Sequence, residues 1–201
     1  MNQVLAGKNT DWSRRCLDAQ QELLKLKEDK AKTEERVAYV TKTYDDLVQT
    51  LKDEIADGQV AVAERGDRLS VNVADQVLFP SGSDRTQPKG EKVLKKVAGV
   101  LRKVKDKQID VEGHTDNVRI TGPLTSKFPT NWELSAARAT TVVRFLERQG
   151  VDAARLAAVG YGEHRSIGPN DTADGRRKNR RIEIVLTPLR SSASSPAAKS
   201  K

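Results

Sequence analysis

The sequence predicts an α/β fold, an α+β sandwich with a four-stranded mixed sheet, preceded by a long heptad helix. Short runs of alternating apolar residues, typical of strands, alternate with two segments whose apolar residues recur at helical spacing. The N-terminal third has no Pro or Gly between Asp11 and Asp57, and its apolar residues follow a heptad pattern. We therefore expect three parts: a helical coiled-coil spacer over residues 1–65, an α/β domain over 66–190 and a disordered, Ser/Ala/Lys-rich tail over 191–201.

The spacer is expected to form one helix over residues 11–57 that pairs with a second helix, most simply in a homodimer. A narrow apolar stripe at a spacing of 3.5 residues has to be buried against a partner. The alternative is a solitary solvated helix that lies on its own domain. Lys30 and Thr33 interrupt the stripe, whose positions are Cys16, Ala19, Leu23, Leu26, Val37, Val40, Tyr44, Leu47 and Leu51.

The following domain is predicted to have the order β-α-β-α-β-β. The second helix should begin at the Thr130–Glu133 pair, which has capping-box spacing, and stop before Gly150. A loop with one Gly and two Pro residues precedes it at 117–130. The expected strands lie near 69–73, 109–112, 156–161 and 182–186, and the expected helices lie over 88–104 and 130–149.

Charge is unevenly spread along the chain. Residues 1–65 contain 11 Lys/Arg against 13 Asp/Glu, and residues 66–201 contain 25 against 15. A basic domain suits nucleic acid, anionic lipid or an acidic polymer such as the cell wall, and charge does not choose among them. Cys16 is the only cysteine, so an internal disulfide is excluded. The sequence shows no run of 18 apolar residues and no signal segment, so we expect a membrane tether to be missing from it.

The second predicted helix carries an arginine in the middle of its apolar face. On a helical wheel Arg138 lies about 40° from Leu134 and about 20° from Phe145. A buried guanidinium is costly unless an anion pairs with it. Arg138 therefore requires a partner, which is either an internal acid or a ligand, unless its stem carries the charge out to solvent.

A second candidate is Asp116, which follows the predicted strand at 109–112. Strand ends that run into loops often carry binding groups, although Asp116 would also suit a loop-capping role. Together, a carboxylate and a guanidinium can hold the two ends of a zwitterionic amino acid. Asp116 would accept hydrogen bonds from the ammonium, and Arg138 would clasp the carboxylate with two parallel hydrogen bonds.

Five blocks of sequence resemble the OmpA C-terminal domain family, which includes the OmpA, MotB and Pal-like domains. In order, they are LFPSGS at 78–83, VEGHTDN at 111–117, NWELSAARA at 131–139, GYGE at 160–163 and NRRIEI at 179–184. The resemblance implies an OmpA-C-like fold and non-catalytic binding of peptidoglycan through the meso-diaminopimelate of its stem peptide. It implies no cofactor and no metal, and it places the grip on Asp116 and Arg138, supported by Thr115, Asn131, Leu134 and Arg181, with Phe79 at the pocket rim.

The resemblance also implies a place in the cell. A domain of this kind tethers the envelope or a membrane to the wall, which indicates the periplasm of a Gram-negative bacterium, in association with the inner or outer membrane. The NWELS stretch and the long 117–130 loop most resemble the MotB branch, which anchors flagellar stators. MotB has a membrane helix with a proton-carrying Asp that this sequence does not show, so a stator anchor remains the alternative to a coiled-coil tether.

Two other classes have weak support. An enzyme would have to use His114, Asp116 and His164, but two histidines fifty residues apart without a ligand-spacing motif do not predict a metal centre. Nucleic-acid binding would rest on the basic stretch at 175–181, which no helix-turn-helix, zinc spacing or aromatic strand accompanies. We expect neither activity.

Overall fold

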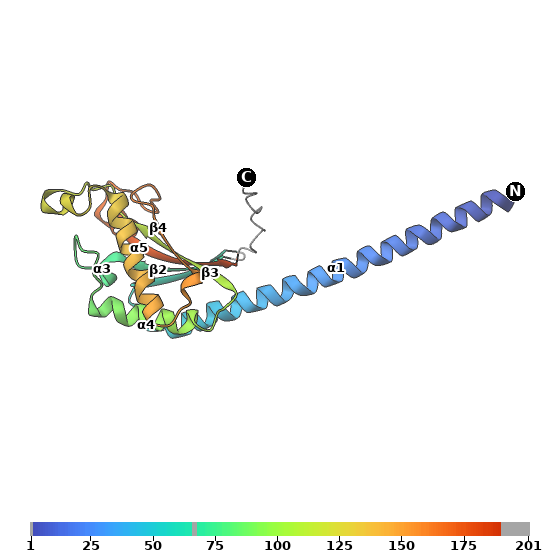
Figure 1. Ribbon diagram of the computed structural model, residues 1–201, viewed down its shortest axis with the longest axis horizontal. Coiled ribbons are helices and arrows are strands. Elements are labelled where there is room, and N and C mark those ends of the chain that lie inside the picture. The colour runs from blue at the N-terminus through green and yellow to red at the C-terminus, as the bar shows by residue number, and fades with distance from the viewer. Residues whose placement is uncertain (1, 66–67, 190–201) are drawn as a thin grey trace, which may run out of the picture. The chain divides into compact units, whose positions relative to one another are not determined.

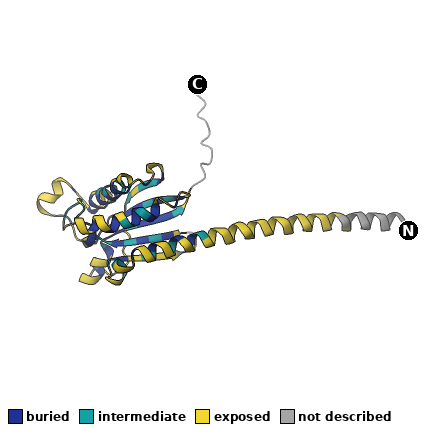
Figure 2. Cartoon of the chain, turned by 90° about the horizontal axis from the view of Figure 1, so that it is seen from below, coloured by how far each residue is buried: buried dark blue, intermediate teal, exposed yellow. Residues whose placement is uncertain are grey.

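The computed structural model describes residues 2–65 and 68–189, and it divides into two compact units between Thr41 and Lys42. The predicted disordered tail, 191–201, lies outside the described residues. The first unit is the N-terminal part of α1 (Asn2–Thr50), and every described residue of α1 from Cys16 to Val37 is exposed (Figure 2). The stripe formed by Leu23, Leu26 and Val37 therefore has no partner within this part of the chain.

The C-terminal turns of α1 belong to the second unit, followed by the short helix α2 (Lys52–Ala56). Leu47 and Leu51 are fully buried there, so the last positions of the heptad stripe pack within the second unit and not against a second helix of a dimer. The chain then turns at Gly58, which has a φ of 66°. The expectation that helical structure ends at Asp57-Gly58 is confirmed.

The sheet has five strands rather than the four expected, and it begins within the segment that we assigned to the spacer. The additional strand, β1, is at the edge and pairs only with β2, from Val60↔Val73 to Arg65↔Arg68. Its sequence, VAVAER, does not alternate between apolar and polar residues, so the strand was not predicted. Among its described side chains, Val60 is the one that is buried. Among the described residues the strand order is β1-β2-β5-β3-β4, and the pair β3–β4 is the parallel one (Figure 1). In that order the strands are β1 (Val60–Arg65), β2 (Arg68–Ala74), β5 (Arg181–Pro188), β3 (Lys107–His114) and β4 (Leu156–Gly160).

The two predicted helices are confirmed as α4 (Pro88–Leu101) and α5 (Asn131–Arg148), and the α/β class with them. Thr130 forms the predicted capping box: Glu133 Oε2 accepts from Thr130 N at 2.8 Å, and Thr130 Oγ1 accepts from Trp132 N at 3.2 Å. Four short helical segments were not predicted: α3 (Asp75–Leu78), α6 (Ala173–Asn179) and the 3-10 turns Gly122–Ser126 and Ala153–Arg155.

Helix α5 lies directly on the backbone of β3 and β4, because a glycine stands at each contact. A Cβ atom on Gly113 would lie 2.2 Å from Ser135 O, and one on Gly160 would lie 2.7 Å from Ala136 N. This close approach fixes the height of α5 above the strand ends. Among the described residues, no helix is both long enough and apolar enough to cross a membrane.

Candidate functional site

One cavity of about 460 Å³ lies where the end of β3, the start of α3 and the first turns of α5 meet. Apolar side chains of the 117–128 loop line part of the cavity. Arg176 of α6 and Arg180, the residue after α6, also line it. Six of the seven residues singled out from the sequence line it: Phe79, Thr115, Asp116, Asn131, Leu134 and Arg138.

Arg138 is buried in the wall of this cavity and has a counter-charge of its own. Its Nη1 lies 3.0 Å from Asp75 Oδ1, its Nε donates to Ser83 O at 2.9 Å, and its Cζ lies 5.1 Å from the centre of the Phe79 ring. Its Nη2 has no hydrogen-bond partner among residues 2–65 and 68–189. The guanidinium is thus held on two nitrogens, which leaves the third for a ligand.

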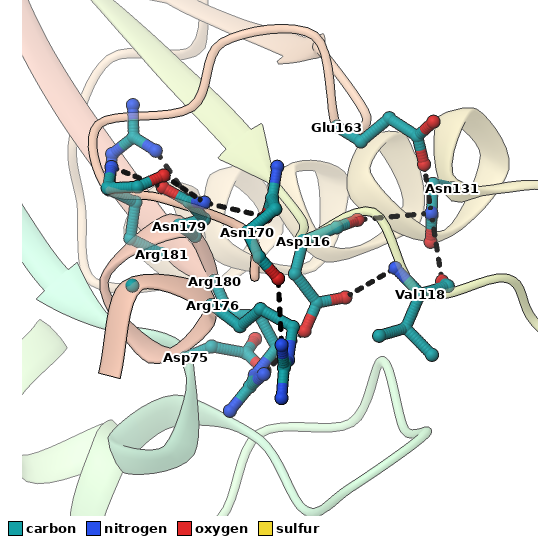
Figure 3. A network of polar contacts seen from close by, with 12 residues as sticks. Asp75, Asp116, Val118, Asn131, Glu163, Asn170, Arg176, Asn179, Arg180 and Arg181 are labelled. Atoms are coloured by element: carbon teal, nitrogen blue, oxygen red, sulfur yellow. Dashed lines mark hydrogen bonds and ion pairs between the residues drawn. The ribbon is translucent and has the colours of Figure 1, made fainter. Parts of the chain in front are cut away.

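Asp116 is also buried in the cavity wall and pairs with a different arginine. Its Oδ2 accepts a hydrogen bond from Arg180 Nη1, and its Oδ1 accepts from Val118 N at 3.1 Å (Figure 3). Asp116 and Arg138 are therefore not direct partners. They belong to two separate ion pairs in the cavity wall, Asp75 with Arg138 and Asp116 with Arg180.

Burial perturbs the pair at the floor of the cavity. The loss of solvent raises the pKa of Asp75, and Asp116 adds to this rise, whereas Arg138 and Arg180 act against it. Burial likewise lowers the pKa of Arg138, and the positive charge of Arg180 acts in the same direction. Burial therefore disfavours the charged form of both groups, and the opposite charges inside the cavity offset part of that cost.

The side chain of Asn131 ties three parts of the site together. Its Nδ2 lies 3.2 Å from Asp116 O, 3.1 Å from Val118 O and 2.8 Å from Glu163 Oε2 (Figure 3). Because Asn131 is the first residue of α5, these bonds fix the loop after β3 to the start of the helix. Asn131 therefore positions Asp116 from behind rather than facing the cavity with free donors.

Thr115 supplies an unused hydroxyl. The residue is buried and lines the cavity, and its Oγ1 has no hydrogen-bond partner within the described parts of the chain. A buried hydroxyl without a partner is costly. Because Thr115 lines the cavity, its hydroxyl is a candidate partner for a polar group of a ligand.

Comparison with known proteins identifies the family. The family model described as "OmpA family" matches residues 78–180, which contain the cavity residues from Phe79 to Arg180. This chain belongs to the OmpA family. The match covers four of the five sequence blocks completely and ends within the last one, at 179–184.

Relatives and solved structures extend the similarity. The probable lipoprotein YiaD of Escherichia coli is 37% identical over 139 residues, 69% of this chain and 60% of YiaD. The structure of the cell wall anchor of the T6SS from Pseudomonas aeruginosa has a TM-score of 0.65 and 37% identity, covering 71% of this chain and 96% of that one. The crystal structure of a putative MotB like protein from Desulfovibrio vulgaris has a TM-score of 0.71 and 28% identity, and the match covers 78% of this chain and 98% of that one. The matched region spans 52% to 60% of the first three curated relatives.

The structure does not bring Arg181, the seventh expected residue, to the cavity of this OmpA-family domain. Arg181 opens β5, and its Nε donates to Glu183 Oε1 at 2.7 Å. Its neighbour Arg180 points into the cavity instead, because successive side chains along extended backbone point to opposite sides. Of the two arginines in the NRRIEI block, the structure places Arg180 and not Arg181 in the cavity lining.

Sequence reasoning also missed Asp75, the counter-charge of Arg138. It lies before the first of the five blocks, and its only local signal is an acidic residue after the strand at 69–73. The loop at 167–170, which lies between the last two blocks, was also missed. Asn179 anchors it by accepting from Ile167 N and Gly168 N, both at 2.8 Å, and thereby positions the adjacent Arg180.

Proposed function

We propose that this chain binds peptidoglycan non-covalently, without a cofactor and without cutting it, by gripping the meso-diaminopimelate of the stem peptide. The observation that carries the proposal is the cavity of about 460 Å³ into which a buried carboxylate, Asp116, and a buried guanidinium, Arg138, both face. The free end of diaminopimelate carries one ammonium and one carboxylate. A zwitterion adds no net charge to the cavity, in which Asp75 pairs with Arg138 and Asp116 pairs with Arg180.

The available atoms suggest how the ligand is held. Its carboxylate takes Nη2 of Arg138, because Nε and Nη1 are occupied by Ser83 and Asp75. Its ammonium approaches Asp116 and competes with Arg180 for Oδ2. The Thr115 hydroxyl, which lacks a partner in the described chain, provides a further donor or acceptor. Each of these is a charge-assisted or buried hydrogen bond, the class with the largest contribution to affinity.

The proposal is tested with purified sacculi and a soluble stem peptide. Wild type should sediment with diaminopimelate-type sacculi. Asp116→Asn and Arg138→Lys should weaken binding by about 10- to 100-fold, the cost of one hydrogen bond to a charged group. These changes keep the approximate size of each side chain and a group that can hydrogen-bond, whereas Ala at either position also removes every contact to its partner. Asp116→Ala and Arg138→Ala should abolish sedimentation where they remain folded.

The matched control is an exposed acid–base pair on the same domain. Asp174 and Arg177 form an ion pair on α6, with Asp174 Oδ1 3.3 Å from Arg177 Nη2 and both side chains more than half exposed. Asp174→Asn and Arg177→Lys should leave sedimentation unchanged. Lysine-type peptidoglycan has no side-chain carboxylate for Arg138, so it should bind more weakly. Equal binding to both wall types would remove the diaminopimelate assignment, and full sedimentation of folded Asp116 and Arg138 variants would place the binding site elsewhere.

The remaining parts of the proposal concern the tether. The family's wall-binding role favours a location in the periplasm of a Gram-negative envelope, with a membrane anchor N-terminal to the spacer. The exposed stripe of α1, which includes Leu23 and Leu26, favours a homodimer formed through the helix. Nothing in the cavity or the spacer favours nucleic acid over an acidic wall polymer.

A second candidate function is anchoring of a stator to the wall. It is favoured by the similarity to the putative MotB like protein from Desulfovibrio vulgaris. Both functions use the same cavity and differ in what the N-terminal helix is attached to. A chromosomal Arg138→Lys exchange separates them: loss of swimming with an intact envelope supports the stator anchor, whereas envelope leakage with normal swimming supports the structural tether.

A further inference from the structure

A second cluster of chemically active side chains lies in the sheet, outside the proposed wall-binding cavity. Glu112 of β3 and Glu183 of β5 are direct cross-strand partners in an antiparallel pair. His114 follows Glu112 by two residues on the same strand and therefore points to the same face. All three line a separate hollow of about 560 Å³, which shares none of its residues with the cavity around Asp116.

His114 is the unusual member of this group. It is 3% exposed, and neither Nδ1 nor Nε2 has a hydrogen-bond partner among the described residues. Its nearest acid is Glu112, whose Oε2 lies 3.7 Å from Nε2, which is longer than a hydrogen bond. The ring stacks on Tyr161 with centroids 5.3 Å apart, which fixes its plane but satisfies neither nitrogen. Buried polar groups without hydrogen bonds are rare, so an imidazole with two unused nitrogens requires an explanation, and a bound ion is one.

Three arginines line this hollow with the two glutamates: Arg68 and Arg181 each bind one carboxylate oxygen, and Arg165 adds a positive charge near Glu112. Glu112 Oε1 lies 3.2 Å from Arg68 Nη2, and Glu183 Oε1 lies 2.7 Å from Arg181 Nε. Arg68 and Arg181 each hold one carboxylate oxygen, so each glutamate retains a second one. Like charges directly opposite each other on neighbouring strands are destabilising. A cation between the two glutamates would turn that repulsion into attraction.

We propose that Glu112, His114 and Glu183 bind a divalent transition-metal ion, with zinc as the best match. One ligand atom from each residue lies within 4.8 Å of the other two, so small side-chain rotations bring them onto one ion. Two carboxylates and a neutral imidazole match the charge of a divalent ion among the direct ligands, while Arg68, Arg165 and Arg181 lie around them in the same hollow. An imidazole nitrogen favours zinc over magnesium or calcium, which prefer oxygen ligands alone. The open side of the hollow leaves a fourth position for water.

The neighbouring arginines fit such a site as outer-sphere partners. Carboxylates that bind metals are commonly held by a further hydrogen bond on the other oxygen, which orients them. Arg181 is buried and fixed by bonds to Arg165 O and Asn179 O, both at 3.2 Å, so it holds Glu183 in place. Arg68 is largely exposed and can move outward when an ion binds. The ion would join β3 to β5 and so strengthen the centre of the sheet.

The test uses the full chain without a tag and after treatment with a chelator. The substitutions Cys16→Ser and His164→Gln remove the other thiol and imidazole groups that could bind zinc. Both residues lie outside the cluster, and Cys16 is exposed on α1. Equilibrium dialysis against zinc should give one ion per chain. Cobalt as a probe should give a visible d–d absorption band typical of nitrogen and oxygen ligands. Zinc should also raise the melting temperature, because a ligand that binds only the native state stabilises it.

Within this background, His114→Gln and Glu183→Gln should each weaken zinc binding by more than about 100-fold, since loss of an outer-sphere group alone costs 10- to 100-fold. A cooperative melt of each variant without metal shows that it is folded. Unchanged zinc binding in either folded variant would overturn the proposal, as would the absence of stoichiometric binding in the background chain. Sacculus binding by Asp116 and Arg138 is a separate readout, so failure of one proposal leaves the other intact.

Discussion

Arg138 Nη1 lies 3.0 Å from Asp75 Oδ1, and both side chains are almost withdrawn from solvent at the floor of the cavity. This pair holds a positive charge in place before any ligand arrives. The second pair, Asp116 with Arg180, does the same for a negative charge. The cavity therefore contains a fixed charge of each sign, and each pair can be tested by itself.

The first prediction concerns Asp75 and pH. Burial raises the pKa of Asp75 above its ordinary value of 3.8, so the native state keeps this proton to higher pH than the unfolded chain does. The contribution of Asp75 to the free energy of unfolding is fully present below the pKa of the unfolded chain, about 4. It is lost as the pH rises through the higher pKa of the native state. The free energy of unfolding of wild type minus that of Asp75→Asn should therefore fall with rising pH from about pH 4 upward. Urea titrations at several pH values measure it, and a difference that rises with pH would contradict the assignment.

The second prediction concerns the hydroxyl of Thr115. Thr115→Val keeps the shape of the side chain and removes an oxygen that has no partner in the described chain. We expect the melting temperature to stay the same or rise, and the affinity for a diaminopimelate tripeptide to fall about 10-fold, the value of one hydrogen bond. Thr140→Val, on α5 but not in the cavity lining, serves as the control for calorimetric titrations. Tight binding by Thr115→Val would show that the hydroxyl does not face the ligand.

The third prediction concerns the contact between α5 and β3. Gly113→Ala places a methyl group 2.2 Å from Ser135 O, so helix and strand have to separate. We expect a loss of about 1–3 kcal/mol in the free energy of unfolding, the usual cost of overpacking, together with weaker sacculus binding because Arg138 moves with α5. Gly99→Ala in α4 is the matched control, since an added Cβ there meets nothing within 4 Å. It should stabilise the domain by up to about 1 kcal/mol, and equal effects of the two changes would refute the argument.

The fourth prediction concerns the exposed stripe of α1. Leu26 is on the heptad stripe and Leu24 is off it, and they are 66% and 61% exposed. If the stripe forms a dimer interface, Leu26→Ser removes two buried leucines per dimer at about 1.5–3 kcal/mol each. The dissociation constant of the dimer should then rise at least about 100-fold, while Leu24→Ser leaves it nearly unchanged. Sedimentation equilibrium decides this, and a monomeric wild type would leave the spacer as a solitary helix.

Much of the site could be predicted from sequence because its key signals are local. The capping box at Thr130 and Glu133 determines where α5 begins, and the helical period then places Arg138 on the buried face. The VEGHTDN block places Thr115 and Asp116 at the end of a strand. These features depend on neighbours within a few residues, so the sequence by itself determined the class of the fold, the two helices and six residues of the cavity.

Only the tertiary structure decided which charges meet. Asp75 at the start of α3 pairs with Arg138 of α5, and Asp116 pairs with Arg180, 64 residues away. The choice between Arg180 and Arg181 depends on where β5 begins, and the meeting of Glu112 with Glu183 depends on the register of β3 against β5. Long-range pairings of this kind follow from how the layers dock, and no short stretch of sequence carries that information.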